Sequence, residues 1–283
     1  MMKIQLHKPY ELPQSWEELP LERLPMVVEM AFLRKTGASA YHDLFRAVLG
    51  IPEKEYRKVM NRYFGRHVSA ATREKNAEEL HSLLLAVRWI WETDLTRRPF
   101  EYIEAEGQKW LLPEQGFKTM SWGELSDAFV HSKAYAEQLE AGETRLHLLI
   151  ATLCRPARKT RGDLWNGDER EPYNEHFVKT RLAGVEKLPA ATKAAIYLWF
   201  VGTMNEVFGA YELFGDGPAQ EEDYPGQSFV RNTFTLAEKG IFGSVPQTRT
   251  ANLHEVFLFL EENNKRERRK ESAQEEANNY AAN

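Results

Sequence analysis

Apolar residues recur every three or four positions through most of the first hundred residues, and several of these runs end at a glycine. Such spacing puts the apolar side chains on one face of a helix. It predicts amphipathic helices over residues 25–37, 39–50, 52–65 and 70–93. Pro25 suits a first helical position because the N–H that proline lacks has no partner there. Ser39 can cap the second helix, and Gly50 can end it in a left-handed conformation.

The pattern changes near residue 100. Apolar and aromatic residues at 100–103 and 110–112 flank a short polar segment in which Gly107 can take a tight turn, which predicts a β-hairpin. An isolated hairpin is marginally stable in water, so this one is expected to pack on helices. Residues 3–6 are a candidate third strand of the same sheet.

Helical spacing then returns and continues to the end of the chain. Ser121 followed three residues later by Glu124 is a capping box, in which each side chain satisfies the other's backbone N–H, and it opens a helix towards Leu139. Further helices are predicted over residues 146–153, 174–185, 189–214 and 228–239. A polar loop at 156–172 interrupts them, and an apolar run at 253–260 passes into a polar tail.

These elements predict a mainly α fold. We expect a helical bundle with a small antiparallel β-hairpin insert, which becomes three-stranded if residues 3–6 join it. Two regions are expected. Residues 1–115 form an N-terminal helical region that ends in the hairpin, and residues 116–283 form a C-terminal helical region with a polar tail.

Composition indicates the cellular compartment and argues against some classes of protein. With 283 residues the chain can bury a core without disulfides, and Cys154 is its only cysteine, which favours a reducing cytosol. The most apolar stretch, residues 194–214, is interrupted by polar residues and glycines, so it predicts a core helix and no membrane span. The net charge is −5, with both signs interspersed. This balance argues against a protein dominated by nucleic-acid binding.

Enzyme signatures are missing. The sequence has no phosphate-binding glycine loop, dinucleotide fingerprint, zinc-protease helix or nucleophile elbow. Residues 163–169 offer oxygen ligands around a glycine but lack the EF-hand pattern, which favours an ordinary acidic turn over a calcium site. The pairs His42–Asp43 and Glu175–His176 are adjacent on helices and do not face each other. We therefore predict no catalytic residue, no cofactor and no metal site.

A basic loop follows the segment at 146–153. Arg155, Arg158, Lys159 and Arg161 could grip phosphates, but no aromatic residues are interleaved with them. A solvated loop or a docking patch for an acidic partner is the favoured interpretation. Cys154, at the end of the apolar segment, is interpreted as a small buried hydrophobe.

Several phrases occur in an order that resembles proteins from the tail-gene region of bacteriophages and prophages. The resemblance is strongest over residues 100–214, with weaker matches at both ends. The phrases are SWEEL at 15–19, MSWGELSD at 120–127, LHLLIATLCRP at 146–156, EPYN at 171–174, LP at 188–189 and NLHE at 252–255. Cys154 stands where the pattern has an aromatic residue, and the basic loop is longer than in the pattern.

The resemblance implies a non-enzymatic tail-assembly chaperone or scaffold that holds a tape-measure-like polypeptide in the host cytoplasm. The seven Trp, eleven Tyr and fifteen Phe residues could line grooves for it as well as a core. The alternatives are a structural part of a tail, neck or baseplate that stays with the virion, and an enzyme or nucleic-acid regulator. The candidate partner-binding residues are Trp122, Tyr135, Arg155, Arg158, Lys159, Arg161, Tyr173 and Trp199.

Overall fold

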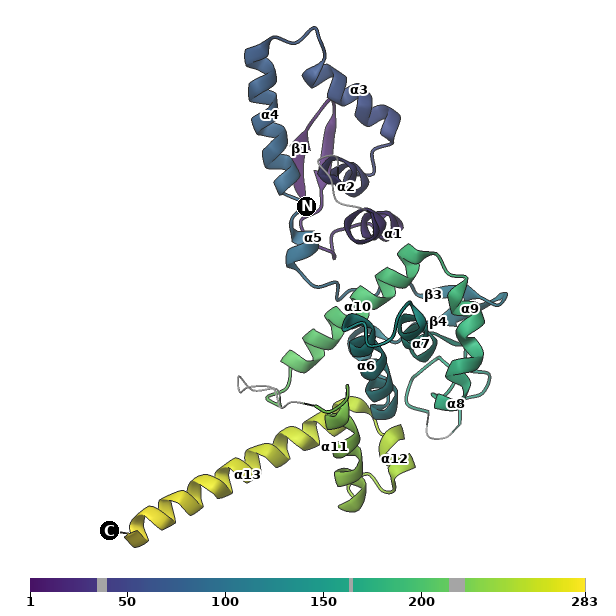
Figure 1. The fold of residues 1–283 in the computed structure, drawn as a ribbon, viewed down its shortest axis with the longest axis vertical. Coiled ribbons are helices and arrows are strands. Elements are labelled where there is room, and N and C mark those ends of the chain that lie inside the picture. Colours follow the sequence, from purple (N-terminus) through teal and green to yellow (C-terminus); the bar gives the residue numbers. More distant parts are fainter. Residues whose placement is uncertain (35–39, 163–164, 214–221, 283) are drawn as a thin grey trace. The chain divides into compact units, whose positions relative to one another are not determined.

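The chain is mainly helical, with small antiparallel sheets, as the sequence predicted. A computed structural model describes residues 1–34, 40–162, 165–213 and 222–282 (Figure 1). Four predicted features lie outside these ranges: the end of the 25–37 helix, the Ser39 cap, the first two residues of the acidic turn at 163–169, and the end of the 189–214 helix.

The chain divides into two compact units. Unit 1 comprises Met1–Phe100 with Leu188–Gly202, and unit 2 comprises Glu101–Lys187 with Thr203–Asn283. The predicted division after residue 115 assigned the hairpin to the N-terminal region, whereas the contacts of the chain place it in unit 2. Residues 188–202, predicted as C-terminal, belong to unit 1.

Unit 1 packs short helices against a two-stranded sheet. Its elements are β1 (Met2–Gln5), β2 (Pro9–Leu12), α1 (Leu24–Val28), a π-helical turn (Glu29–Leu33), α2 (Ala40–Leu49), α3 (Glu53–Phe64), α4 (Ala70–Leu85) and α5 (Trp89–Glu92). The Trp16 and Trp89 rings meet edge to face at 5.1 Å in its core. Both indole N–H groups are satisfied, because Trp16 donates to the Thr93 carbonyl and Trp89 to the Pro13 carbonyl, each at 3.0 Å.

Two predictions for unit 1 were wrong. The helix expected over 70–93 breaks after Leu85, and the turn there brings Trp89 to Trp16. The strand at the N-terminus does not join the hairpin. It pairs with β2, and the register sets Ile4 opposite Tyr10. Pairing β1 with the adjacent segment closes a short loop, which costs less chain entropy than pairing it with a strand about a hundred residues away.

Unit 2 contains the remaining elements. They are β3 (Tyr102–Ala105), β4 (Gln108–Leu111), α6 (Trp122–Ala136), α7 (Thr144–Leu153), β5 (Arg155–Pro156), α8 (Glu175–Val178), α9 (Leu182–Glu186), the end of α10 (Ala190–Gly209), α11 (Gln227–Glu238), α12 (Val245–Thr250) and α13 (Leu253–Ala282). The predicted hairpin is confirmed as β3 and β4, and its third strand is β5. Within the described ranges, no helix is both long and apolar enough to cross a bilayer.

Helix α6 organises unit 2. Ser121 caps it by accepting the Glu124 N–H at 3.3 Å, as predicted. The Glu124 carboxylate does not complete the capping box, because it turns to two buried arginines. Backbone bonds from Trp122 N–H to the Ala251 carbonyl (2.9 Å) and from Leu253 N–H to the Met120 carbonyl (3.1 Å) join the start of α6 to the start of α13.

We predict that Gly107→Ala lowers the free energy of unfolding by about 1–2 kcal/mol. Gly107 turns the hairpin at φ 72°, a left-handed conformation that costs alanine energy. A Cβ atom there would meet nothing within 4 Å, so the effect isolates the backbone. The measurement is urea unfolding of the full chain.

Gly209→Ala is the matched control. A Cβ atom on Gly209 is equally free of neighbours, but this residue ends α10 without a left-handed φ. Alanine should therefore stabilise the protein by about 0.4–1 kcal/mol. Equal effects of the two substitutions would contradict the turn assignment.

Candidate functional site

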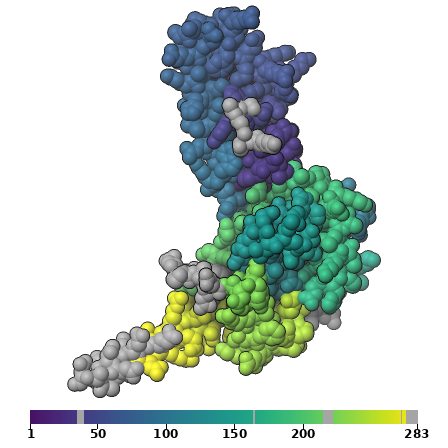
Figure 2. Space-filling view, in the orientation of Figure 1, coloured from purple at the N-terminus to yellow at the C-terminus, as the bar shows by residue number. Residues whose placement is uncertain are grey.

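A groove of about 610 Å³ lies in unit 2 between α6, α10, α11 and α13. Figure 2 shows α11 and α12 on the surface of this unit, beside the start of α13. Five aromatic rings dominate the lining, and we call this site the aromatic groove. The rings belong to Trp122, Phe129, Phe208, Phe229 and Phe257, and Met204, Leu213 and Leu260 extend the apolar wall.

The rings form a continuous packed layer. Phe229 lies 4.9 Å from Phe129 and 5.0 Å from Trp122, and Phe257 meets Trp122 edge to face at 5.5 Å. The Trp122 indole N–H donates to the Thr233 hydroxyl at 2.8 Å, so the ring leaves no polar atom unsatisfied. Trp122 is the floor, with 1% of its surface exposed, whereas Phe129 and Phe208 are half-buried and form the accessible walls.

Polar groups surround this apolar surface. The Lys133 ammonium lies 3.5 Å from the Glu222 carboxylate, which accepts the N–H groups of Gly226 (3.0 Å) and Ser228 (2.9 Å) at the start of α11. Burial alone would raise the pKa of Glu222, but these hydrogen bonds and Lys133 lower it below its usual value. Arg231 is exposed and forms no ion pair with any described residue. The groove thus offers an apolar floor with one uncompensated cation at its edge.

A second pocket of about 240 Å³ lies between α6, α7 and α8, and we call it the polar pocket because Asp127, His131, Arg145, Tyr173 and Glu175 line it. The Asp127 carboxylate accepts from the Tyr173 hydroxyl at 2.5 Å and from Arg249 at 2.7 Å, and Arg249 also binds Glu175 at 2.6 Å. Burial, followed by the charge of Arg145, lowers the pKa of His131 to about 4. His131 is therefore neutral at physiological pH.

This polar pocket makes weak catalytic machinery. Burial and the nearby Asp127 carboxylate raise the pKa of Tyr173, so its phenol keeps its proton. Both donors bond to Oδ2 of Asp127, so the Tyr173 hydroxyl and Arg249 hold this carboxylate in a fixed orientation. In the described part of the chain, no three His, Cys, Asp or Glu side chains gather as a metal site would require.

Four buried charged residues form a closed cluster beside α6. Glu124, Arg155, Asp168 and Arg170 are each at most 5% exposed. Arg170 donates to Glu124 at 2.7 Å and to both Asp168 oxygens at 2.9 Å, and Arg155 contacts Glu124 at 3.0 Å and Asp168 at 3.2 Å. Two positive and two negative charges balance, which is how buried ions are tolerated.

The pKa values of Arg170 in the cluster and of the neighbouring Cys154 are both shifted. Burial would lower the pKa of Arg170, but the Glu124 and Asp168 carboxylates outweigh it and raise that pKa. Burial raises the pKa of the neighbouring Cys154 thiol to about 12, so no thiolate forms at physiological pH. Arg170 and the two terminal nitrogens of Arg155 use their donors on protein carboxylates and carbonyls, so we interpret the cluster as structural. It holds Arg155, Asp168 and Arg170 against α6.

The four predicted aromatic site residues do not gather in one place. Trp122 lines the aromatic groove. Tyr135 is half-buried near the end of α6, and Tyr173 lines the polar pocket. Trp199 is fully buried in the part of α10 that belongs to unit 1, so it presents no surface to a partner.

The four predicted basic residues do not form one patch either. Arg155 is 1% exposed in the charged cluster, which corrects its expected place on a docking loop. Arg158 donates to the Arg170 carbonyl at 3.3 Å, and Arg161 binds Glu169 at 2.7 Å and lies over the Trp165 ring at 4.4 Å. Only Lys159 is exposed without a contact to a described residue.

Sequence reasoning missed most of the groove. Phe129 lies seven residues after Trp122 and therefore on the same face of α6, a signal that helical spacing could have supplied. Phe208, Phe229 and Phe257 lie on three other helices, and no local pattern links them. The partners of Glu124 were hidden for the same reason, because Arg155 and Arg170 come from a loop that the sequence presents as polar.

Known proteins provide no assignment for this chain. No protein-family model, no curated protein and no solved structure matches it. The function must therefore be argued from the residues of the two units themselves.

We predict that Glu124→Gln lowers the free energy of unfolding by about 3–5 kcal/mol, because it leaves two buried guanidinium groups short of one negative charge. The control is Glu169→Gln in the same segment. Its carboxylate pairs with Arg161 at an exposed position, so the loss should be about 0–1 kcal/mol. Comparable losses in urea unfolding would contradict a structural role for the cluster.

Glu222 should make stability depend on pH. Its pKa is lower in the folded state than the ordinary value of 4.5, so it stabilises the fold above pH 4.5 and this contribution disappears as the pH falls through the folded pKa. Glu222→Gln should remove that acidic component from the pH profile of thermal unfolding. An unchanged profile between pH 5 and pH 3 would contradict the assignment.

Proposed function

We propose that this chain is a non-enzymatic assembly protein that holds an amphipathic helix of a protein partner in the aromatic groove. The observation that carries the proposal is the layer of five aromatic rings around a cavity of about 610 Å³. At about 30 Å³ for each water molecule, this volume corresponds to roughly twenty waters. It is enough for several large side chains, and aromatic walls are typical of the residues that contribute most to protein binding.

The groove fits a helical partner because apolar side chains at positions i, i+3, i+4 and i+7 form a single stripe along a helix. Such a stripe can enter the groove while the polar face of the partner stays in water. The exposed Arg231 at the edge favours an acidic residue beside that stripe. Amide side chains of Gln227, Asn232 and Asn264 also lie along the edge and can bond polar groups of the partner.

The identity of the partner comes from the sequence resemblance alone. It suggests a tape-measure-like tail polypeptide, long and rich in helix, which must be kept soluble before assembly. On this basis we propose a tail-assembly chaperone that acts in the host cytoplasm. A catalytic role receives less support, because a pKa of about 4 makes His131 a weak base and the raised pKa of Tyr173 makes its phenol a weak acid.

A designed helical peptide of about 20 residues tests the groove directly. It carries Leu at i, i+3, i+4 and i+7 and Glu beside this stripe, and its binding is followed by fluorescence anisotropy. We expect saturable binding in the micromolar range. Phe208→Ala should weaken it by about tenfold or more, because Phe208 forms an accessible wall.

Phe234→Ala is the matched control. Phe234 lies on α11, is 60% exposed and does not line the groove, so its loss should change the affinity by less than about twofold. Arg231→Glu, at an exposed position that folding tolerates, should weaken the Glu peptide and favour the same peptide with Lys. No binding at about 1 mM peptide, or equal losses for Phe208 and Phe234, would contradict the proposal.

Mass spectrometry of purified phage particles separates a chaperone from a structural component. A chaperone leaves before maturation, so the chain should be absent from particles that contain its partner. Stoichiometric presence in the particles would replace the chaperone role by a structural one.

A further inference from the structure

The net charge of −5 conceals an uneven distribution. Residues 1–100 contain 16 Lys and Arg against 13 Asp and Glu, whereas residues 101–283 contain 21 against 29. The N-terminal part is therefore positive and the remainder strongly negative. Such asymmetry within one chain indicates that the two parts meet different partners.

The positive charge is concentrated on the hairpin formed by α3 and α4. Residues 53–85 contain seven Lys and Arg against five Glu, and the seven basic residues all fall between residues 54 and 75, where there are two Glu. All seven basic side chains are exposed. We define the basic face as the four that recur at every fourth residue: Lys54, Lys58, Arg62 and Arg66.

The five Glu side chains of α3 and α4, among them Glu74, Glu78 and Glu79 on α4, form no ion pair with this face in the part of the chain that the structure describes. Glu55 binds Lys8 at 2.8 Å and His7 and Tyr10 at 3.0 Å, and Glu53 pairs with Arg57. Among the residues that the structure describes, no member of the basic face forms an ion pair. Its charge is therefore available to an anion from outside unit 1.

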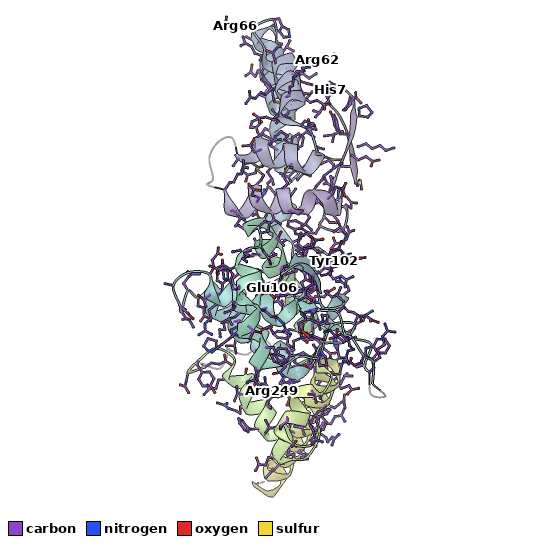
Figure 3. All side chains as sticks on the ribbon, turned by 90° about the vertical axis from the view of Figure 1, so that its right-hand side faces the viewer. His7, Arg62, Arg66, Tyr102, Glu106 and Arg249 are labelled. Carbon is purple, nitrogen blue, oxygen red and sulfur yellow. The ribbon has the colours of Figure 1, made fainter. Side chains whose placement is uncertain are left out.

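The spacing of the basic face is regular. Lys54, Lys58 and Arg62 follow one another at intervals of four residues, so they form a row along one side of α3 about 6 Å apart. Arg66 follows in the turn, and Figure 3 labels Arg62 and Arg66 at this end of the hairpin. A row of this kind can contact several phosphates of one polyanion at the same time.

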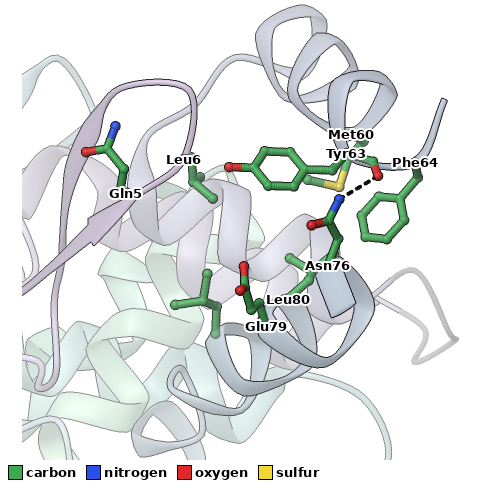
Figure 4. A pocket seen from close by; sticks show the side chains of 9 residues that line it. Gln5, Leu6, Met60, Tyr63, Phe64, Asn76, Glu79 and Leu80 are labelled. Carbon is green, nitrogen blue, oxygen red and sulfur yellow. Dashed lines mark hydrogen bonds between the residues drawn. The ribbon is translucent and has the colours of Figure 1, made fainter. Parts of the chain in front are cut away.

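A hydrogen bond holds the two helices of the α3–α4 hairpin together. The Asn76 amide donates to the Tyr63 carbonyl at 2.9 Å and so fixes α4 to the end of α3 (Figure 4). The cavity between these helices measures only about 30 Å³, which is the room for one water and no ligand. The anion must therefore bind outside, on the basic face.

The chemistry of this face favours nucleic acid over a protein or a membrane. On α3 and α4 the described structure exposes one large apolar side chain, Leu85 at the C-terminal end of α4. Protein interfaces depend on aromatic or aliphatic anchors, and membrane-surface helices need an apolar face. The small exposed side chains of Ala70 and Ala71 leave room for a nucleic-acid backbone to approach the start of α4. The planar guanidinium group of arginine matches the geometry of phosphate.

We propose that the basic face of the α3–α4 hairpin binds duplex nucleic acid through its phosphate backbone, without reading the base sequence. This contact is independent of the aromatic groove, which lies in unit 2. The net charge of the whole chain argued against nucleic-acid binding. That sum combines a positive N-terminal part with a negative remainder, so it does not reveal a local basic face.

The test uses the full chain and a fluorescent DNA duplex of about 24 base pairs of mixed sequence, titrated at about 50 and about 200 mM NaCl. Wild type should bind more weakly at the higher salt. The triple variant Lys58→Gln, Arg62→Gln, Arg66→Gln should lose at least about tenfold in affinity at low salt. Its salt dependence, as the slope of log K against log salt, should be shallower by about 2.7, or roughly 0.9 for each lost phosphate contact.

A second triple variant is the control. Arg266→Gln, Arg268→Gln, Arg269→Gln removes the same charge from exposed positions on α13, and it should change the affinity by less than about twofold. Circular dichroism should report the same helix content for all three proteins.

Several outcomes would overturn the proposal. They are no binding by wild type at the lower salt, an equal loss in the α13 variant, and tighter binding of polyglutamate or of anionic phosphatidylserine vesicles than of the duplex. A second duplex of the same length and different sequence should bind within about twofold, and a larger difference would contradict backbone recognition.

Discussion

Arg170 is fully buried and cannot give up its proton, so the chain around it must supply negative charge. Glu124 and Asp168 meet this demand, and Arg155 shares both carboxylates. These arginines and Asp168 are therefore held against α6. The opposite face of α6 is then free to present Trp122 and Phe129 to the aromatic groove, because a helix separates residues two positions apart by about 200°. One electrostatic constraint thus positions both the polar and the apolar side of unit 2.

Local patterns were sufficient to predict the fold class. The glycine at 107, the Ser121 cap and the four-residue spacing of α2 and α3 each depend on neighbours within one turn, and the structure has the expected hairpin and helices. Predictions that needed a distant partner were less successful. The helix over 70–93 breaks so that Trp89 can reach Trp16, and the N-terminal strand pairs with β2 instead of the hairpin. Neither contact has a signature within its own segment.

The residues of the candidate site also divide into those with a local sequence signal and those that depend on distant partners. Trp122 was identified from the sequence and lies in the groove, but three of its ring neighbours come from α10, α11 and α13. Arg155 was expected on a docking loop because its segment is basic, and it is buried because two acids far apart in the chain converge on it. A polar segment can hide a buried cluster when its charges are complementary, and composition cannot distinguish this case from a solvated loop. Whole-chain charge likewise concealed the basic face on α3 and α4.

The proposed function depends most on the binding of an amphipathic helix in the aromatic groove. Fluorine NMR of protein labelled with 5-fluorotryptophan tests it most directly, because Trp122 forms the floor of the groove while Trp16 and Trp89 lie in the core of unit 1. On titration with the amphipathic peptide, we expect the Trp122 resonance to shift to a saturating value and those of Trp16 and Trp89 to stay in place. A stationary Trp122 signal in the presence of bound peptide would contradict it.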